Sequence, residues 1–143
     1  MTAPHHLFVY GTLRRVFGHE HARILRAHCR FLGEGELGGQ LFDVGSYPAA
    51  VAGPETGGNV RGELYRVIRP DLLFPVLDRF EGCGADDEEP TLYRREMVKV
   101  RLDTGRKRSA WVYLYNRDTS GLSPIPGGDY AAYRGSNRMI ARG

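Results

Sequence analysis

The sequence has few cysteines and lacks any long apolar run. Its 143 residues include only two cysteines, Cys29 and Cys83. A single pair in a chain of this length does not form the disulfide framework of a small secreted domain. No run approaches the roughly 20 apolar residues that cross a membrane, and the amino terminus has no basic segment followed by an apolar stretch. We therefore expect a cytoplasmic protein without a membrane anchor.

A strong charge of either sign is also missing. The sequence holds 20 Lys and Arg against 17 Asp and Glu, a formal net charge of +3, which attracts polyanions weakly unless basic residues cluster. Two short basic clusters exist, Arg14-Arg15 and residues 106–108. Neither is interleaved with the aromatic residues on which single-stranded nucleic acids stack. We interpret both clusters as solvated turns and expect no nucleic-acid partner.

The five histidines do not show the spacing of a metal site. They stand at positions 5, 6, 19, 21 and 28, and this pattern matches no established arrangement of metal ligands. We therefore predict no metal site.

Length and the distribution of glycine and proline indicate the fold class. A chain of 143 residues fits one domain, 1–143, because a second core leaves both parts too small to be stable. Between Gly33 and Gly58 these residues interrupt the chain repeatedly, so the strands there are short. Many short strands with few helices favour an α+β barrel whose openings are covered by helices. The tail lacks the apolar residues of a core element, and we expect it to be flexible from about residue 131.

Apolar residues that alternate with polar ones predict the strands. In the last predicted strand Trp111, Tyr113 and Tyr115 share one face because side chains alternate along a strand. The predicted strands span residues 7–10, 36–44, 49–52, 59–67, 93–102 and 109–115.

Helical spacing predicts two helices, at about residues 19–28 and at 70–81. The second has Pro70 suited to its start and Gly82 suited to the position beyond its end. Pro75 lies inside this range and removes a backbone bond, so a start at Pro75 is the alternative. The predicted apolar side of this helix consists of Leu73, Val76, Leu77 and Phe80.

Glu81 is the first candidate for chemistry. It follows Leu77 by four residues, which on a helix places a carboxylate at the edge of the apolar stripe. Burial and the carbonyl groups of a helix C-terminus both raise the pKa of a carboxyl group, as suits a general base. An ion pair with Arg79, Arg94 or Arg95, or a solvated helix end, explains the same position. Spacing alone leaves both interpretations open.

The segment YGTL, from Tyr10 to Leu13, is the second candidate. A strand that ends at Gly11 can turn sharply and direct the N–H groups of Gly11, Thr12 and Leu13 at one point. Such a cradle binds a carboxylate or a developing oxyanion. The same residues also form an ordinary turn in many proteins. The segment therefore indicates a site only in combination with Glu81.

Several segments together resemble a known family. They occur in the family's order over about residues 7–130 and read LFVYGTLRR, GSYPAAV, LDRFEG followed by LYRREMVKV, AWVYLYN, and GGDY. The chain resembles the gamma-glutamylcyclotransferase-like superfamily, within its branch of short gamma-glutamylamine-cyclotransferase-like proteins.

This resemblance implies a small mixed β-barrel flanked by a few short helices, and an enzyme without a cofactor. The implied reaction cyclises a small gamma-glutamyl amine or peptide to 5-oxoproline and releases a free amine. The resemblance makes Glu81 the base and Tyr10 to Leu13 the substrate cradle. It also places Tyr93 and Tyr113 beside the site, where their hydroxyls orient substrate or, equally well, belong to the barrel core.

Two other functions stay open at this point. One is a non-catalytic protein that binds a small ligand in the same pocket, and the other is an interaction module built on the basic surface. The acidic run at residues 86–89 either favours a cationic leaving amine or is a solvated loop. Neither the leaving amine nor the oligomeric state is predicted.

Overall fold

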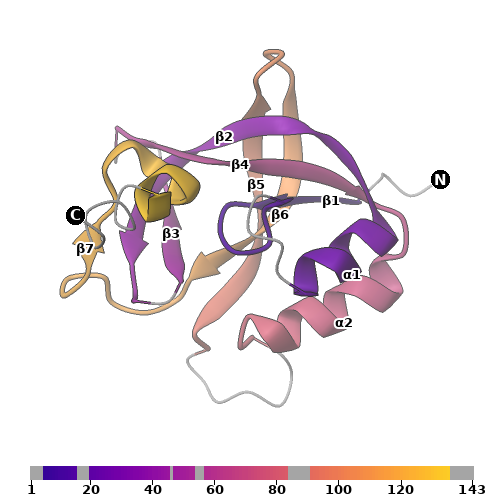
Figure 1. Cartoon of the computed structure of the whole chain (residues 1–143), viewed down its shortest axis with the longest axis horizontal. Coiled ribbons are helices and arrows are strands. Elements are labelled where there is room, and N and C mark those ends of the chain that lie inside the picture. The colour runs from indigo at the N-terminus through magenta and orange to yellow at the C-terminus, as the bar shows by residue number, and fades with distance from the viewer. Residues whose placement is uncertain (1–4, 16–19, 46, 54–56, 84–90, 136–143) are drawn as a thin grey trace.

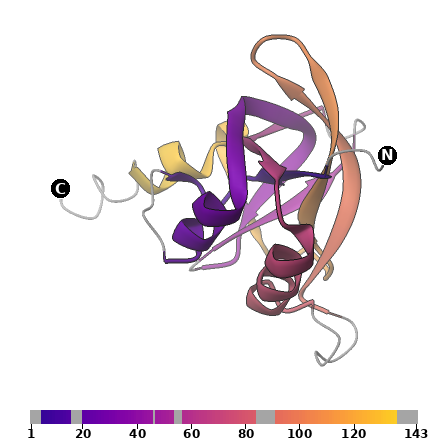
Figure 2. The ribbon, with the colours of Figure 1, turned by 90° about the vertical axis from the view of Figure 1, so that its right-hand side faces the viewer.

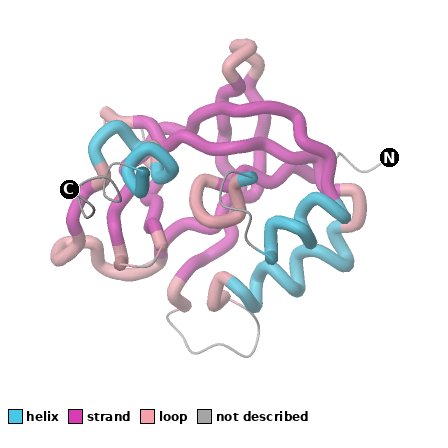
Figure 3. The backbone as a smooth tube through the Cα atoms, in the orientation of Figure 1, coloured by secondary structure: helices cyan, strands magenta, loops and turns pink. Residues whose placement is uncertain are grey.

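The computed structural model describes residues 5–15, 20–45, 47–53, 57–83 and 91–135. Figures 1 and 3 show a strand-rich fold with helices at its sides. Residues 130–135 form a further helical segment after the last named element. The elements in chain order are β1 (His5–Val9), α1 (Glu20–His28), β2 (Cys29–Asp43), β3 (Pro48–Ala52), β4 (Asn59–Val67), α2 (Pro70–Phe80), β5 (Tyr93–Leu102), β6 (Lys107–Tyr115), β7 (Ser123–Pro124) and the 3-10 helix η3 (Pro126–Gly128).

Five strands close into a barrel in the order β2, β4, β1, β6 and β5, and β5 pairs back onto β2. The closing contact pairs Gly35 with Leu102 and Glu36 with Arg101. Strands β1 and β6 run parallel, whereas the other four pairs of the barrel are antiparallel. The predicted mixed β-barrel with flanking helices is therefore confirmed. Closure pairs each of these five strands on both sides.

The last part of β2 runs past the barrel and forms a small outer sheet. Residues 39–43 pair with β3, and Phe42 and Asp43 pair with β7. This sheet brings β3 to the end of β1, where the N–H of Ala50 donates to the hydroxyl of Tyr10 (3.3 Å). The outer sheet thus places one wall beside the segment that follows β1.

Alternation along the strands builds two cores on opposite faces of the barrel wall. Phe8 and Tyr10 belong to the inner core, whereas Leu7 and Val9 belong to the outer core under the helices. The inner core also contains Leu37, Leu41, Val60, Leu64, Val112 and Leu114. The outer core also contains Leu13, Leu25, Tyr65, Val67, Leu73, Phe74, Leu77, Tyr93 and Tyr113. Trp111 and Tyr115 pack against this outer core, so the shared face predicted for β6 is confirmed.

Helix α2 buries one face and exposes the other. Leu73, Phe74 and Leu77 are buried against the barrel. Val76 and Phe80, predicted on the buried side, are 37% and 36% exposed. The prediction for these two side chains is wrong because α2 contacts the barrel along one stripe that is narrower than the apolar surface of the helix.

The start of α2 matches the prediction at Pro70, and the alternative start at Pro75 is wrong. Pro75 is exposed on the outer side of the helix, and Asp71 is exposed as well. Proline has no N–H, so the carbonyl of Asp71 lacks the hydrogen bond that residue 75 would donate in a regular helix. Because this carbonyl lies on the exposed side of α2, it is open to hydrogen bonding by solvent. Helix α1 lies side by side with α2 (Figures 1 and 2), and the shorter predicted helix is confirmed.

Arg14, predicted in a solvated turn, is buried instead. It is 5% exposed, and its Nη1 lies 2.9 Å from Oδ1 of Asp129 and its Nε 3.9 Å from Oε2 of Glu63. A guanidinium is costly to bury without such partners. Both partners come from distant segments, so local sequence did not reveal them. Arg15 is exposed, and Arg106 lies in the turn between β5 and β6, as predicted. Lys107 and Arg108 instead begin strand β6, so the prediction of a turn is wrong for these two residues.

The segment after β6 contributes to the inner core. Tyr130 is 1% exposed there, and the hydroxyl of Tyr133 donates to Oδ2 of Asp43 (2.7 Å). The prediction that this segment supplies no core element is therefore wrong. Residues 131–135 are helical and lie at the other end of the barrel from α2 (Figures 1 and 2). Flexibility from about residue 131 and a single domain over 1–143 stay predictions, and residues 136–143 lie outside the described part.

Candidate active site

Glu81 stands directly after α2, where the helix ends in a Schellman motif. The N–H of Gly82 donates to the carbonyl of Arg79 (3.2 Å). The N–H of Cys83 donates to the carbonyl of Asp78 (2.9 Å). Gly82 has a φ of 70°, a left-handed conformation that glycine adopts without strain. The local sequence therefore ends the helix and fixes the backbone that carries the Glu81 side chain.

The YGTL segment leaves β1 in a tight turn. The N–H of Arg14 donates to the carbonyl of Gly11 (3.0 Å), which closes the turn. Within the described residues, the N–H groups of Thr12 and Leu13 have no hydrogen-bond acceptor. Two neighbouring backbone donors without a protein partner can bind the oxygen of an anion. Convergence of the N–H groups of Gly11, Thr12 and Leu13 on one point stays a prediction.

Glu81 and the cradle meet at one cavity of about 440 Å³. The cavity lies between the segments that follow β1 and α2, and β3, β5 and β6 complete its wall. The residues predicted for the site all line it: Tyr10, Gly11, Thr12, Leu13, Glu81, Tyr93 and Tyr113. The tertiary structure therefore brings the two candidate segments together.

Burial controls the protonation of Glu81. It raises the pKa of this carboxyl group from 4.5 to about 8, because an apolar wall solvates the charged form poorly. No Lys, Arg or His lines the cavity in the part of the chain that the structure describes. Arg94 and Arg95, two of the predicted ion-pair partners, pair with Glu96 and Asp78 instead. The described residues form no ion pair with Glu81, so its negative charge is not compensated.

Three of the four tyrosines that line the cavity donate their hydroxyl hydrogens to other groups of the protein. Tyr10 donates to the carbonyl of Tyr113 (2.5 Å) and Tyr93 to the carbonyl of Pro48 (2.6 Å). Tyr113 donates to Oδ1 of Asp78 (2.7 Å). Burial, together with the nearby carboxyl group, raises the pKa of Tyr10 and Tyr93. These hydroxyls stay neutral and connect the walls of the cavity, while orientation of substrate by them stays a prediction.

Sequence reasoning missed six residues of the cavity wall: Phe8, Val9, Tyr47, Pro48, Phe80 and Leu92. Tyr47 and Pro48 belong to the GSYPAAV segment, so the family resemblance contained a signal for them. The other four lie one or two positions before predicted site residues in the chain. The acidic run at residues 86–89 lies outside the described residues, so its influence on the leaving amine stays a prediction.

The sequence matches one family over most of its length. Residues 7–132 match the family described as gamma-glutamyl cyclotransferase, AIG2-like. The gamma-glutamylcyclotransferase family protein YtfP of Escherichia coli K12 is 33% identical over 125 residues, 87% of this chain and 94% of that protein. The gamma-glutamylaminecyclotransferase of Rattus norvegicus is 34% identical over 68% of this chain and 64% of that protein. This chain thus spans just under two thirds of the rat protein.

A solved structure supports the same assignment. YkqA from Bacillus subtilis matches with a TM-score of 0.70 and 27% identity over 96% of this chain. The match spans 43% of YkqA, less than half of that longer chain. The relatives carry the names of enzymes, which confirms the enzyme prediction. From its fold, its cavity and these matches, the chain belongs to the gamma-glutamyl cyclotransferase, AIG2-like family of enzymes.

Proposed function

We propose that this protein cyclises a small gamma-glutamyl amine or peptide to 5-oxoproline and releases a free amine. One observation carries the proposal: Glu81 and the unpartnered N–H groups of Thr12 and Leu13 line the same cavity. The carboxylate of Glu81 can accept a proton, and the N–H groups of Thr12 and Leu13 can donate hydrogen bonds to a negative oxygen. The name of the rat relative supports an amine as the leaving group.

The proposed reaction proceeds through one intramolecular attack. Glu81, in its ionised form, accepts a proton from the α-amino group of the substrate. The α-nitrogen then bonds to the γ-carbonyl carbon, and the N–H groups of Thr12 and Leu13 donate to the oxygen that becomes negative. The bond to the leaving nitrogen breaks as Glu81 returns its proton to that nitrogen. The second proton of the attacking nitrogen then passes by way of Glu81 to the amine, which leaves as an ammonium ion. No electrons leave or enter, so the proposed reaction needs no redox cofactor.

The pKa of Glu81 suits this exchange. The value of about 8 lies close to the ordinary pKa of an α-amino group, about 7.7 to 8.0. Proton transfer between the two groups is then nearly balanced in both directions, as a residue that first accepts and later donates requires. Holding the amino group beside the γ-carbonyl lowers the barrier further, by up to about 7 to 11 kcal/mol in favourable intramolecular reactions.

We further propose that the protein acts on its small-molecule substrate in the cytoplasm, without nucleic acid. Cys29 is a buried cysteine outside any disulfide, which suits a reducing compartment. No helix in the described part of the chain is long and apolar enough to cross a bilayer.

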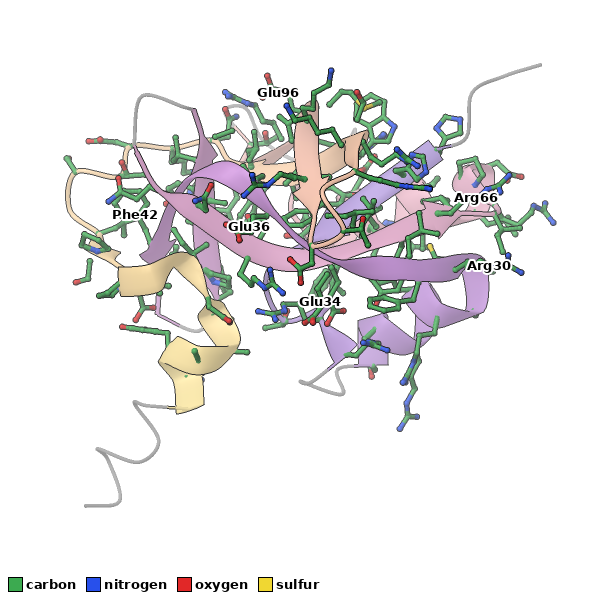
Figure 4. The ribbon with its side chains drawn as sticks, turned by 90° about the horizontal axis from the view of Figure 1, so that it is seen from above. Arg30, Glu34, Glu36, Phe42, Arg66 and Glu96 are labelled. Carbon is green, nitrogen blue, oxygen red and sulfur yellow. The ribbon has the colours of Figure 1, made fainter. Side chains whose placement is uncertain are left out.

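Product analysis tests the proposed function. The protein is incubated with a panel of gamma-glutamyl amines and dipeptides, and 5-oxoproline and free amine are quantified by chromatography. We expect equal amounts of both products from at least one compound, and none with Glu81→Gln. Glu96→Gln is the matched control, because Glu96 does not line the cavity, is exposed at the edge of the molecule (Figure 4) and pairs with Arg94 (2.7 Å). Thermal stabilisation by these compounds without any product overturns the proposal.

Gly11→Ala is expected to weaken the cradle. A Cβ at this position would lie 2.9 Å from Cγ of Pro48, so the turn has to move away from β3. A displacement of about 1 Å in a catalytic site can cost roughly 100-fold in rate, and we expect kcat/KM to fall about 10- to 100-fold. Gly38→Ala is the control, since a Cβ there meets nothing within 4 Å. Equal kinetics of the two variants contradict the assignment of the turn.

A further inference from the structure

The side chain of Asp78 connects α2 to two strands of the barrel. Its Oδ1 accepts hydrogen bonds from Nε of Arg95 (2.9 Å) and from the hydroxyl of Tyr113 (2.7 Å). Its Oδ2 accepts from Nη2 of Arg95 (3.2 Å). The Asp78 side chain is 22% exposed, so these contacts form at the edge of the buried interface. One carboxylate therefore holds the helix against both β5 and β6.

The donors that Asp78 binds are themselves held in place. The guanidinium carbon of Arg95 lies 4.2 Å from the centre of the Phe74 ring and 4.8 Å from that of Trp111. A planar guanidinium near two aromatic rings has few other positions available. The two rings therefore fix both the position and the orientation of the Arg95 guanidinium that binds Asp78.

The same residue also holds the end of the helix through its backbone. The carbonyl of Asp78 accepts the N–H of Cys83 (2.9 Å) in the Schellman motif that encloses Glu81. Asp78 precedes Glu81 by three residues, which is less than one turn of helix. Its side chain is thus fixed to the barrel and its backbone to the segment that carries Glu81.

Tyr113 extends this connection to the cradle. Its hydroxyl binds Asp78, and its carbonyl accepts the hydroxyl of Tyr10 (2.5 Å). Tyr10 directly precedes Gly11 in the cradle, and its hydroxyl also accepts the N–H of Ala50 (3.3 Å). A continuous set of hydrogen bonds therefore runs from the helix that carries the base to the turn that carries the amide donors.

We propose that Asp78 is a positioning residue, which through Arg95 and Tyr113 sets the distance between Glu81 and the cradle. The inference rests on the proposed function of Glu81 as the base. Asp78 does not line the catalytic cavity, so it acts through other residues and does not touch the substrate. Such a residue affects the alignment of reacting atoms more than the binding of substrate.

Kinetics of two variants test this role. Asp78→Asn removes the charge that holds Arg95, and Tyr113→Phe removes one hydroxyl from the same contact. For both we expect kcat to fall about 10- to 100-fold while KM changes less than threefold. If Asp78→Asn does not fold, the pKa of Glu81 in Tyr113→Phe carries the test, because Tyr113 itself lines the cavity and its kinetics alone do not separate positioning from substrate contact.

A surface pair supplies the matched control. Oδ1 and Oδ2 of Asp103 accept hydrogen bonds from Arg61 (2.6 and 2.5 Å), the same two-point geometry as at Asp78. Arg61 also lies 3.7 Å from Glu34 and 3.8 Å from Glu36, which project from β2 at the outer surface (Figure 4). Asp103→Asn is therefore expected to leave kcat and KM unchanged.

A measurement without substrate separates this inference from the proposed function. The carboxyl group of Glu81 is titrated by carbon NMR, with Glu81→Gln identifying its signal. Tyr10 and Tyr93 are the cavity tyrosines whose pKa is raised by burial and also by the charge of Glu81, and both therefore stay neutral below pH 9. If Asp78 positions Glu81 in its buried site, Asp78→Asn and Tyr113→Phe lower the pKa of Glu81 by about one or more, as water gains access.

The kinetic and titration results together decide whether Asp78 is a positioning residue. A lower kcat at nearly constant KM with a lower pKa of Glu81, absent in Asp103→Asn, supports the positioning role. Unchanged kcat and pKa in folded variants overturn it, as does a loss of activity that only follows the unfolded fraction. If the wild-type protein forms no 5-oxoproline, the proposed function fails, and the titration alone decides whether Asp78 holds Glu81.

Discussion

Glu81→Gln is expected to abolish 5-oxoproline formation and at the same time to stabilise the protein above pH 8. Loss of a general base costs roughly 10²- to 10⁴-fold in rate, and here the same group also returns the proton to the leaving amine. The stabilisation follows because the wild-type protein must bury an uncompensated negative charge at alkaline pH. One substitution therefore removes activity and adds stability.

The size of the stability gain follows from the pKa of Glu81. Its rise from 4.5 to about 8 on folding corresponds to about 5 kcal/mol once the group is fully ionised in both states. Relaxation of the site reduces this figure, and we expect about 2 to 4 kcal/mol at pH 9, or on the order of 10 °C in Tm. Calorimetry at pH 5 and pH 9 measures it. Glu96→Gln, at an exposed carboxylate, is the control, and no gain for Glu81→Gln at pH 9 contradicts the buried ionised carboxylate.

Catalytic rate and stability are expected to change in opposite directions with pH. Only ionised Glu81 accepts a proton, so its titration makes kcat/KM rise about tenfold per pH unit below pH 8, and this contribution of Glu81 levels off above pH 8. A carboxyl group whose pKa is raised by folding stabilises the protein fully below pH 4.5. This contribution is lost as pH rises through about 8. Ionisation of Glu81 with rising pH thus increases the catalytic rate and decreases the stability of the protein.

The two pH profiles are measured separately because the substrate also titrates. The α-amino group of the substrate has an ordinary pKa of about 7.7 to 8.0, so kinetics alone do not identify Glu81. The difference in unfolding free energy between wild type and Glu81→Gln depends on the protein only. We expect this difference to change between pH 4.5 and about 8. If it stays constant over this interval, the rate profile belongs to the substrate.

Local patterns predicted most of the elements because local physics determines them. Trp111, Tyr113 and Tyr115 were predicted on one face of β6 because successive side chains of any strand point to opposite faces, whatever the strand packs against. Pro70 and Gly82 marked the ends of α2, since the first lacks an N–H that the helix start does not need and the second adopts a φ of 70°.

The wrong predictions concern burial, which depends on distant residues. Arg14 is buried because Asp129 and Glu63 come to it from other segments. Tyr130 joins the inner core although its neighbours in sequence are polar or small. Val76 lies on the apolar surface of α2 but outside the stripe that contacts the barrel.

By itself, the sequence determined the position of six strands, the helix ends and, through its family resemblance, which two segments to examine. The prediction of a short strand at 36–44 is wrong, because β2 runs for 15 residues from Cys29 to Asp43, and β7 was not predicted. Turn chemistry and alternation act over a few residues, so they can be read without the fold. Only the tertiary structure decided that Glu81 and the YGTL turn share one cavity. It also decided that Arg94 and Arg95 pair with other carboxylates and that burial raises the pKa of Glu81 to about 8. Those outcomes depend on barrel closure, because closure alone sets which distant groups meet and which lose contact with water.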